Sequence, residues 1–145
     1  MHEPPEPTGP VLFFDGECGL CNRVVRLMMR LDRAGGLRYG PLQGPHGQAY
    51  LRAKGLPTEA FSTLVYVPSW ANRADEVPLF RTDGVIAAFA ACGSVGRALG
   101  GALRVLPQVV RDGLYRGVAR VRYRIFGAWK PTPLPDPAWQ LRLID

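Results

Sequence analysis

The chain has 145 residues, of which 47% are hydrophobic and 21% are charged, and these values are ordinary for a single soluble domain. It contains no apolar run near the roughly 18 residues that a membrane span requires. The net charge is +6, but the arginines are spread along the chain instead of gathering in a nucleic-acid-binding tail. The first ten residues lack the basic start and apolar stretch of a secretory signal. We therefore expect a cytoplasmic protein, and favour neither a nucleic-acid partner nor stable membrane insertion.

The first forty residues predict a strand, a helix and a second strand. The apolar run VLFF at residues 11–14 follows a proline, which is typical of a short buried strand. Over residues 20–32, apolar residues recur at spacings of three and four, which predicts a helix with one buried face that stops before Gly35. Residues 37–42 predict the second strand, and a right-handed crossover would place it parallel to the first.

The rest of the chain predicts further elements in a regular order. They are a weaker helix over residues 44–55, a strand over 63–67, an antiparallel partner strand over 78–81, a helix that Thr82 and Asp83 cap and that runs to Ala91, and helices over 93–106 and 107–126. Four of the first ten residues are proline, which predicts a disordered segment over 1–10, and the Pro-rich residues 128–145 predict an extended tail. The predicted fold class is α/β: one domain over residues 11–127, with a mixed four-stranded sheet between helices and additional C-terminal helices.

The pattern that indicates a chemical function is the C-x-x-C pair Cys18 and Cys21, which lies at the junction of the first predicted strand and helix. Unpaired N–H groups and the dipole at a helix N-terminus stabilise a thiolate, so we expect Cys18 to be exposed, partly ionised and nucleophilic. Cys21 lies almost one turn further along the same face, where it can attack a mixed disulfide on Cys18. We therefore predict thiol-disulfide exchange without a cofactor, with Cys21 as the resolving thiol. The partner would be an unidentified protein or small-molecule thiol or disulfide, and the oligomeric state stays open.

Other interpretations of the pair remain. Structural zinc needs four ligands, and Cys92, His46 and His2 are not paired at ligand spacing, so we expect no metal. Cys92 lies in an apolar run, where a small buried hydrophobe is the usual interpretation. The pair could also be merely structural. In another functional class, a non-catalytic binding module would use the Arg-rich helices to contact a protein, RNA or membrane partner.

Two acidic residues flank Cys18, and anionic neighbours raise the pKa of a thiol. Asp15 either accepts a proton from Cys21 or orders the loop by bonding backbone N–H groups of residues 16–18, and both interpretations stay open. Glu17 is expected to be exposed and inert.

The last predicted helix carries an apolar stripe flanked by arginines. The stripe consists of Val110, Leu114, Val118, Val121 and Ile125. Basic-flanked amphipathic helices bind membrane surfaces, but such a stripe more often packs on the core while the arginine stems extend along it. We expect packing on the core, with Arg111 and Arg122 on one side of the stripe and Arg116 and Arg120 on the other.

Three blocks of the chain resemble a known family. The segment DGECGLCN at residues 15–22 resembles the DCC family of predicted thiol-disulfide oxidoreductases, which is named for its Asp-x-x-Cys-x-x-Cys pattern. The segment RTDGV at residues 81–85 is similar to a second block of that family. A third block is its C-terminal helical signature, which is matched by Leu106-Pro107, Arg111-Asp112, Tyr115, Ala119-Arg120, residues 122–124 and Phe126-Gly127. The resemblance spans residues 11 to about 127 and implies a thioredoxin-like fold and dithiol chemistry, without naming a substrate.

The chain departs from the family pattern in two places. Members often have another cysteine shortly after the Phe-Gly, and residues 128–145 contain none, so an exchange step through that cysteine is in question. Thioredoxin-like proteins usually place a cis-proline just before the third strand, and Ser62 stands there if residues 61–64 hold that place. We therefore expect a trans peptide at Ser62, because a non-proline cis bond costs about 2.5–4 kcal/mol. We also expect the Ser62 hydroxyl or amide to lie beside Cys18.

Overall fold

The computed structural model describes residues 8–33, 35–59, 64–127 and 142–144 of the chain. Its strands are β1 (Val11–Phe14), β2 (Arg38–Pro41), β3 (Val65–Val67) and β4 (Leu79–Phe80). They form a sheet of order β2-β1-β3-β4, in which β1 pairs parallel with β2 and antiparallel with β3, and β3 pairs antiparallel with β4. The predicted mixed sheet, parallel crossover and hairpin are confirmed.

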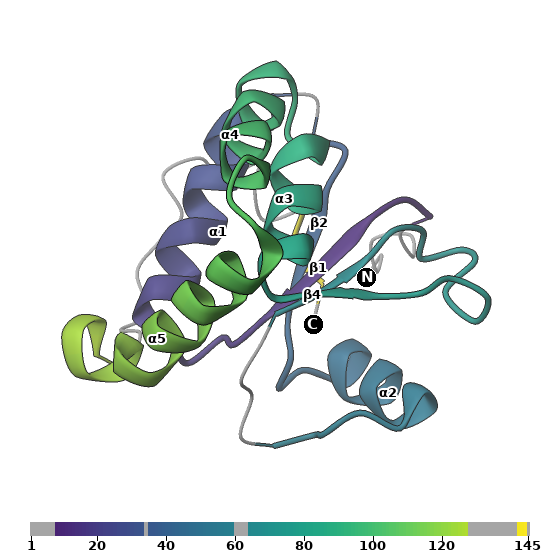
Figure 1. The fold of residues 1–145 in the computed structure, drawn as a ribbon. Helices are drawn as coiled ribbons and strands as arrows, with labels where there is room; N and C mark the ends of the chain where they lie inside the picture. The colour runs from purple at the N-terminus through teal and green to yellow at the C-terminus, as the bar shows by residue number, and fades with distance from the viewer. Residues whose placement is uncertain (1–7, 34, 60–63, 128–141, 145) are drawn as a thin grey trace.

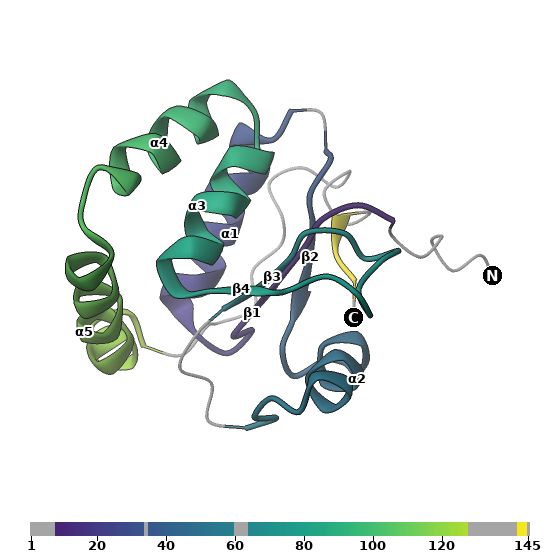
Figure 2. The same cartoon turned by 45° about the vertical axis from the view of Figure 1, so that its right-hand side comes forward.

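Five helices lie in the described ranges: α1 (Gly19–Leu31), α2 (Pro45–Lys54), α3 (Arg81–Ala91), α4 (Ser94–Arg104) and α5 (Gln108–Phe126). α1 and α3 cover one face of the sheet with α4 and α5 beside them, and α2 lies on the other side (Figures 1 and 2). The open four-stranded sheet with these helices is consistent with a thioredoxin-like fold. None of the described helices has the length and hydropathy that crossing a membrane would need.

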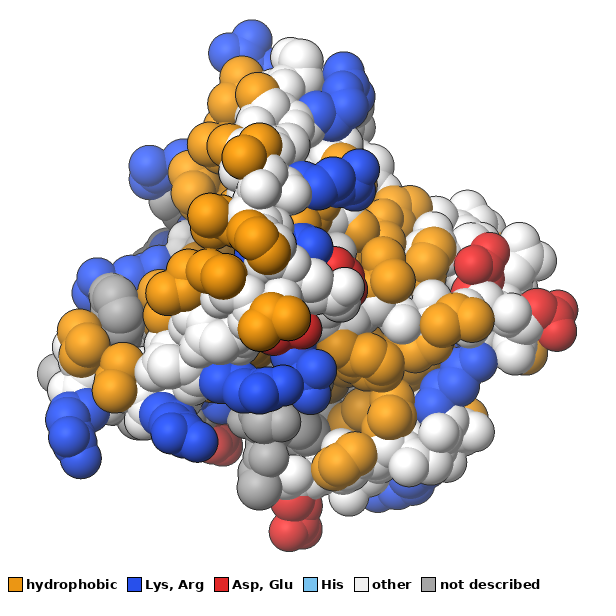
Figure 3. Space-filling model, in the orientation of Figure 1, with side chains coloured by type: hydrophobic (Ala, Val, Ile, Leu, Met, Phe, Trp, Pro, Cys, Tyr) orange, Lys and Arg blue, Asp and Glu red, His pale blue; other side chains and the backbone are white. Residues whose placement is uncertain are grey.

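α5 packs on the domain with its polar face. Arg111 and Arg122 are 9% and 8% exposed, whereas Leu114 and Ile125 are 58% and 67% exposed. The expectation that the apolar stripe packs on the core is therefore wrong, and Figure 3 shows hydrophobic side chains on the surface over this helix. The reason is that each buried arginine pairs with an acidic side chain of another segment, Arg122 with the buried Asp15 and Arg111 with the partly exposed Asp83, and these pairs turn that side of the helix inward.

Alternate residues of β1 build two cores on opposite faces of the sheet. Leu12 and Phe14 pack with side chains of α1 and α3, whereas Val11 and Phe13 pack with side chains of α2 and with Trp70. This alternation follows from the two-residue period of a strand. The strand that leads into the C-x-x-C pair is thus anchored on both faces.

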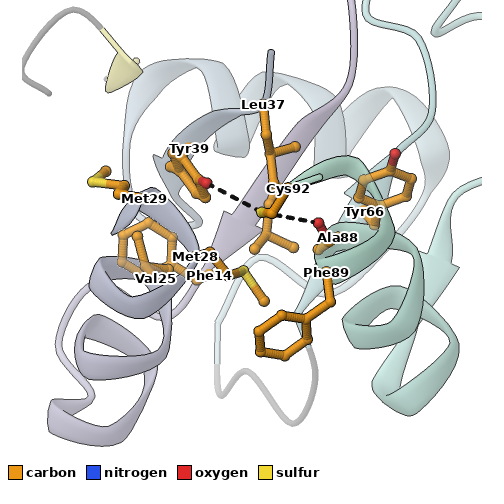
Figure 4. Close-up of a cluster of buried hydrophobic side chains, with 11 residues drawn as sticks. Phe14, Val25, Met28, Met29, Leu37, Tyr39, Tyr66, Ala88, Phe89 and Cys92 are labelled. Carbon is orange, nitrogen blue, oxygen red and sulfur yellow. Dashed lines mark hydrogen bonds between the residues drawn. The ribbon is translucent and has the colours of Figure 1, made fainter. Parts of the chain in front are cut away.

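Cys92 lies in the first of these cores (Figure 4). It is 1% exposed, its Sγ donates to the Ala88 carbonyl at 3.2 Å, and the Tyr39 hydroxyl lies 3.8 Å from the sulfur. Burial raises the pKa of the Cys92 thiol to about 11. The prediction of a small buried hydrophobe at this position is confirmed.

Asp32 ends α1 and turns the chain toward β2. Its buried carboxylate accepts the backbone N–H groups of Gly35 at 3.0 Å, Gly36 at 3.3 Å and Leu37 at 3.0 Å. Gly35 adopts a left-handed φ of +69°, as a glycine after a helix often does, but the helix cap itself is Asp32.

The start of α3 differs from the prediction that Thr82 and Asp83 cap it. The N-cap is Phe80, and no side chain caps the helix. The Thr82 hydroxyl instead donates to Asp112 at 3.4 Å, and the Asp83 carboxylate pairs with Arg111 at 3.4 Å. Both side chains are engaged by α5, so they are not available to the first turn of their own helix.

The last described residues return to the sheet. The Ile144 N–H donates to the Tyr39 carbonyl at 2.8 Å, and Leu143 forms a parallel bridge with Tyr39. The Arg142 guanidinium donates to the backbone carbonyl of Asp32 at 2.8 Å. Most of the predicted disordered segment and of the predicted tail, together with Ser62, lies outside the described residues.

Candidate active site

The loop between β1 and α1 is held by hydrogen bonds within itself and to Gln43. The Asp15 carbonyl accepts the Cys18 N–H at 3.2 Å, and the Asp15 carboxylate accepts the Glu17 N–H at 3.0 Å. The Gln43 side chain donates to the Asp15 carboxylate at 2.7 Å and accepts the Gly16 N–H at 2.9 Å. Asp15 therefore has the contacts that the loop-ordering interpretation requires, and Glu17 is exposed as expected.

Cys18 occupies the N-cap of α1. Its backbone is extended, with φ −85° and ψ 125°, and its Sγ accepts the backbone N–H of Cys21 at 3.4 Å. The Asn22 side chain donates to the Cys18 carbonyl at 2.9 Å and fixes the first turn from the other side. The sulfur thus caps the helix at the positive end of its dipole.

The Cys18 side chain is 0% exposed, so the expectation of an exposed nucleophile is wrong for this conformation. The Gly19 N–H, next along the chain, donates to the Gly127 carbonyl at 3.2 Å. The chain directly after α5 is therefore held against the start of α1, a contact between residues far apart in sequence. An external disulfide can reach Cys18 only through a local opening of the site.

Cys21 lies beside a buried ion pair. Arg122 donates to the Cys21 sulfur at 3.5 Å and forms a salt bridge with the Asp15 carboxylate at 3.2 Å. Burial, together with the hydrogen bond and charge of Cys18, raises the pKa of the Cys21 thiol to about 12, and the Arg122 charge opposes this shift. Cys21 is therefore a thiol near neutral pH, next to the Arg122 guanidinium, whose charge favours its thiolate.

An apolar cavity of about 280 Å³ adjoins Cys21. Aliphatic and aromatic side chains from β1, α1, α3 and α5 form most of its wall, and Cys21 and Arg122 form part of one side. Leu114 and Val118 of α5 lie at its rim and are 58% and 46% exposed, so the cavity opens to the surface. The surroundings of the Cys21 sulfur on this side are therefore mostly apolar, in keeping with the burial that raises its pKa.

Further polar contacts hold α5 over the site. They are Arg111 with Asp83 at 3.4 Å, Thr82 with Asp112 at 3.4 Å, and the Leu64 N–H with the Tyr115 hydroxyl oxygen at 3.0 Å. The α5 partners in these contacts, and Arg122, all belong to the C-terminal signature that carried the family resemblance. The signature therefore marks the face of α5 that docks beside the cysteines.

The structure brings Asp15, Cys18 and Cys21 together, whereas Ser62 lies outside the described residues. Sequence reasoning did not assign Arg122 or Gln43 to the site. The sequence feature that could have indicated Arg122 as a site residue is its place in the C-terminal signature. No sequence feature indicates Gln43. Within the described ranges, no group of three or more His, Cys, Asp and Glu side chains could hold a metal ion.

Comparison with known proteins gives a consistent result. The model of the family described as DCC1-like thiol-disulfide oxidoreductase matches residues 12–128. The uncharacterized protein YuxK of Bacillus subtilis is 33% identical over 140 residues, which cover 92% of this chain and 93% of that protein. A chloroplastic DCC family protein of Arabidopsis thaliana is 30% identical over 122 residues, which cover 84% of this chain and 67% of that protein. No solved structure matches the chain.

Proposed function

We propose that this chain, which belongs to the DCC1-like thiol-disulfide oxidoreductase family, exchanges disulfides through Cys18 and Cys21. The observation that carries the proposal is the Cys21 N–H aimed at the Cys18 sulfur at 3.4 Å, at the N-cap of α1. It supports the nucleophile's role for Cys18, because a hydrogen bond from a backbone donor stabilises the reactive thiolate.

In the first step, the site opens and Cys18 loses its proton. The Cys18 thiolate attacks one sulfur of a substrate disulfide, so a bond forms between Cys18 and that half of the substrate. The substrate's own disulfide bond breaks, and its other half leaves as a thiolate that takes up a proton from water.

In the second step, Cys21 loses its proton and its thiolate attacks the Cys18 sulfur. The bond between Cys18 and the substrate breaks, the second substrate thiolate leaves, and a Cys18–Cys21 disulfide forms. The dithiol has then lost two electrons and the substrate disulfide has gained them. The Arg122 guanidinium, 3.5 Å from Cys21, supports this step by stabilising the attacking thiolate.

Two supporting residues complete the proposal. Asp15 orders the loop and positions Arg122, and it also lies near enough to Cys21 to affect its pKa, which supports a role in accepting the Cys21 proton. Ser62 is proposed as a donor to the Cys18 thiolate on the resemblance alone.

The test follows the reduced protein with oxidised glutathione by mass spectrometry. Wild type is expected to form a short-lived Cys18–glutathione adduct and then the Cys18–Cys21 disulfide, with release of two glutathione molecules. Cys21→Ser should stop at the adduct on Cys18, and Cys92→Ala should behave as wild type. The Cys21→Ser variant would also capture protein partners as mixed disulfides.

Equal modification of all three cysteines would remove the nucleophile assignment. An adduct that forms on Cys21 in Cys18→Ser as fast as on Cys18 in wild type would reverse the two roles. A chain whose thiols all react slowly would favour the non-catalytic binding module.

A further inference from the structure

The exposed hydrophobic side chains of this protein gather on α4 and α5. In the part of the chain that the structure describes, nine of the eleven exposed large hydrophobics lie between residues 95 and 125. Val105 and Val109, at the connection of the two helices, are 83% and 84% exposed, and Ile125 is 67% exposed. Figure 3 shows hydrophobic side chains running over both helices on one side of the molecule. We call the exposed side chains of residues 95–125 the α4–α5 face.

The same helices are strongly basic. Residues 94–126 contain seven arginines and one acidic residue, Asp112. Arg111 and Arg122 are buried in ion pairs, and the other five arginines are exposed. Arg116, Arg120 and Arg124 recur every four residues, so they form a row beside the apolar stripe of α5. In Figure 3, Lys and Arg side chains lie along the flanks of the hydrophobic surface.

This arrangement is a fixed feature of the folded domain. The Arg122–Asp15 and Arg111–Asp83 pairs hold the polar side of α5 inward. Val110 and Ile125 of the apolar stripe are therefore 46% and 67% exposed, and Leu114 and Val118, which border the cavity beside Cys21, are still 58% and 46% exposed. Monomeric proteins rarely leave a contiguous apolar surface of this kind without a partner.

We propose that the α4–α5 face docks on the surface of an anionic lipid bilayer without crossing it. Charge complementarity selects this occupant, because apolar side chains enter the boundary of the acyl region while flanking arginines reach anionic headgroups. A second copy of the chain would instead bring two rows of arginines together, and like charges across an interface oppose association. The proposal does not depend on the chemistry of Cys18 and Cys21.

The experiment measures co-sedimentation of the full chain with vesicles of phosphatidylcholine alone, or with about one third phosphatidylglycerol. Binding is expected only to the anionic vesicles, and it should fall as salt is raised. Each arginine near an anionic leaflet strengthens binding by about fivefold, so Arg120→Gln with Arg124→Gln should weaken it by about 25-fold. The matched control, Arg52→Gln with Lys54→Gln on α2, removes the same charge from another part of the molecule and should change binding by less than about threefold.

A second variant tests the apolar part. Val105→Ser, Val109→Ser and Ile125→Ser together should weaken vesicle binding by at least tenfold, because three exposed apolar side chains no longer enter the bilayer. Thermal unfolding by circular dichroism checks that each variant is folded.

Three results would overturn the proposal. One is no binding of wild type to the anionic vesicles. Another is an equal loss in the α2 control, which would mean that net charge alone attracts the lipid. The third is a dimer in sedimentation equilibrium that the serine variant dissociates, which would assign the face to a second copy.

Discussion

Replacing Arg122 by Gln removes the cation that joins Asp15 to Cys21. The Arg122 and Asp15 side chains are 10% and 5% exposed, so the change removes a buried ion pair. Breaking such a pair lowers the free energy of unfolding by about 3 kcal/mol, which is a large part of the 5–15 kcal/mol typical of a domain. Arg111→Gln is the matched control, because its side chain is equally buried but its partner Asp83 is 43% exposed, and it should cost about 1 kcal/mol.

The effect on chemistry separates the two variants further. A hydrogen bond from a charged donor is worth about 1.5–3 kcal/mol, which corresponds to one or two units of thiol pKa. Loss of Arg122 would then reduce the Cys21 thiolate population by about 10- to 100-fold at neutral pH. A more basic thiolate is a better nucleophile, and this recovers about half of the effect on a logarithmic scale. The resolving step should therefore slow by about 3- to 10-fold.

The assay mixes reduced protein with an aromatic disulfide that releases thionitrobenzoate. Attack by Cys18 releases the first equivalent, and closure of the Cys18–Cys21 disulfide releases the second in a phase that does not depend on reagent concentration. Arg122→Gln should slow the second phase, Arg122→Lys should restore part of it, and Arg111→Gln should leave it within about twofold of wild type. An unchanged second phase in Arg122→Gln, or an equal slowing in Arg111→Gln, would refute the role of Arg122.

Three further predictions concern stability, each read from urea unfolding. Gly96→Ala should lower the free energy of unfolding by more than about 3 kcal/mol, because the added Cβ would lie 1.9 Å from the Phe89 carbonyl oxygen. Gly101→Ala, whose added Cβ has nothing within 4 Å, should raise the free energy of unfolding by up to about 1 kcal/mol. Equal effects of the two changes would contradict the α3–α4 packing. The raised pKa of Cys92 favours its neutral form in the folded state, so its contribution to stability is fully present below the unfolded pKa and is lost as pH rises toward about 11. Over that window the free energy of unfolding of wild type should fall by about 1.4 kcal/mol more per pH unit than that of Cys92→Ala. Parallel pH dependence of the two proteins would contradict the raised pKa. Asp32→Ala should lower the free energy of unfolding by about 2–3 kcal/mol, because three backbone N–H groups lose their hydrogen bonds to the carboxylate. A decrease below about 0.5 kcal/mol would contradict the capping role of Asp32.

The fold around the cysteines could be predicted because its signals are local. A short apolar run, a C-x-x-C pair and a helical period stand next to one another, and together they define β1, α1 and β2. The orientation of α5 could not be predicted in this way. Its apolar stripe is the strongest local signal, but the Arg122–Asp15 pair that decides which face turns inward joins residues far apart in the chain.

The same limit applies to parts of the candidate site. The burial of Cys18 accompanies a contact between Gly19 and Gly127, from opposite ends of the domain. Gln43 acts through its two hydrogen bonds to the loop before α1, and no pattern in the sequence around it indicates them.

The polar docking of α5 sets the register of this helix more than it adds to the stability of the domain. The contacts from Arg111 to Arg122 span about 16 Å along the helix axis. A shift of one residue would rotate the helix by about 100° and break all of them together, whereas an apolar stripe on an apolar surface can slide and find new contacts. Buried polar groups are known to select one alignment among several in coiled coils, at little gain in stability. In this chain the selected alignment determines which carbonyl meets the start of α1 and which cation meets Cys21.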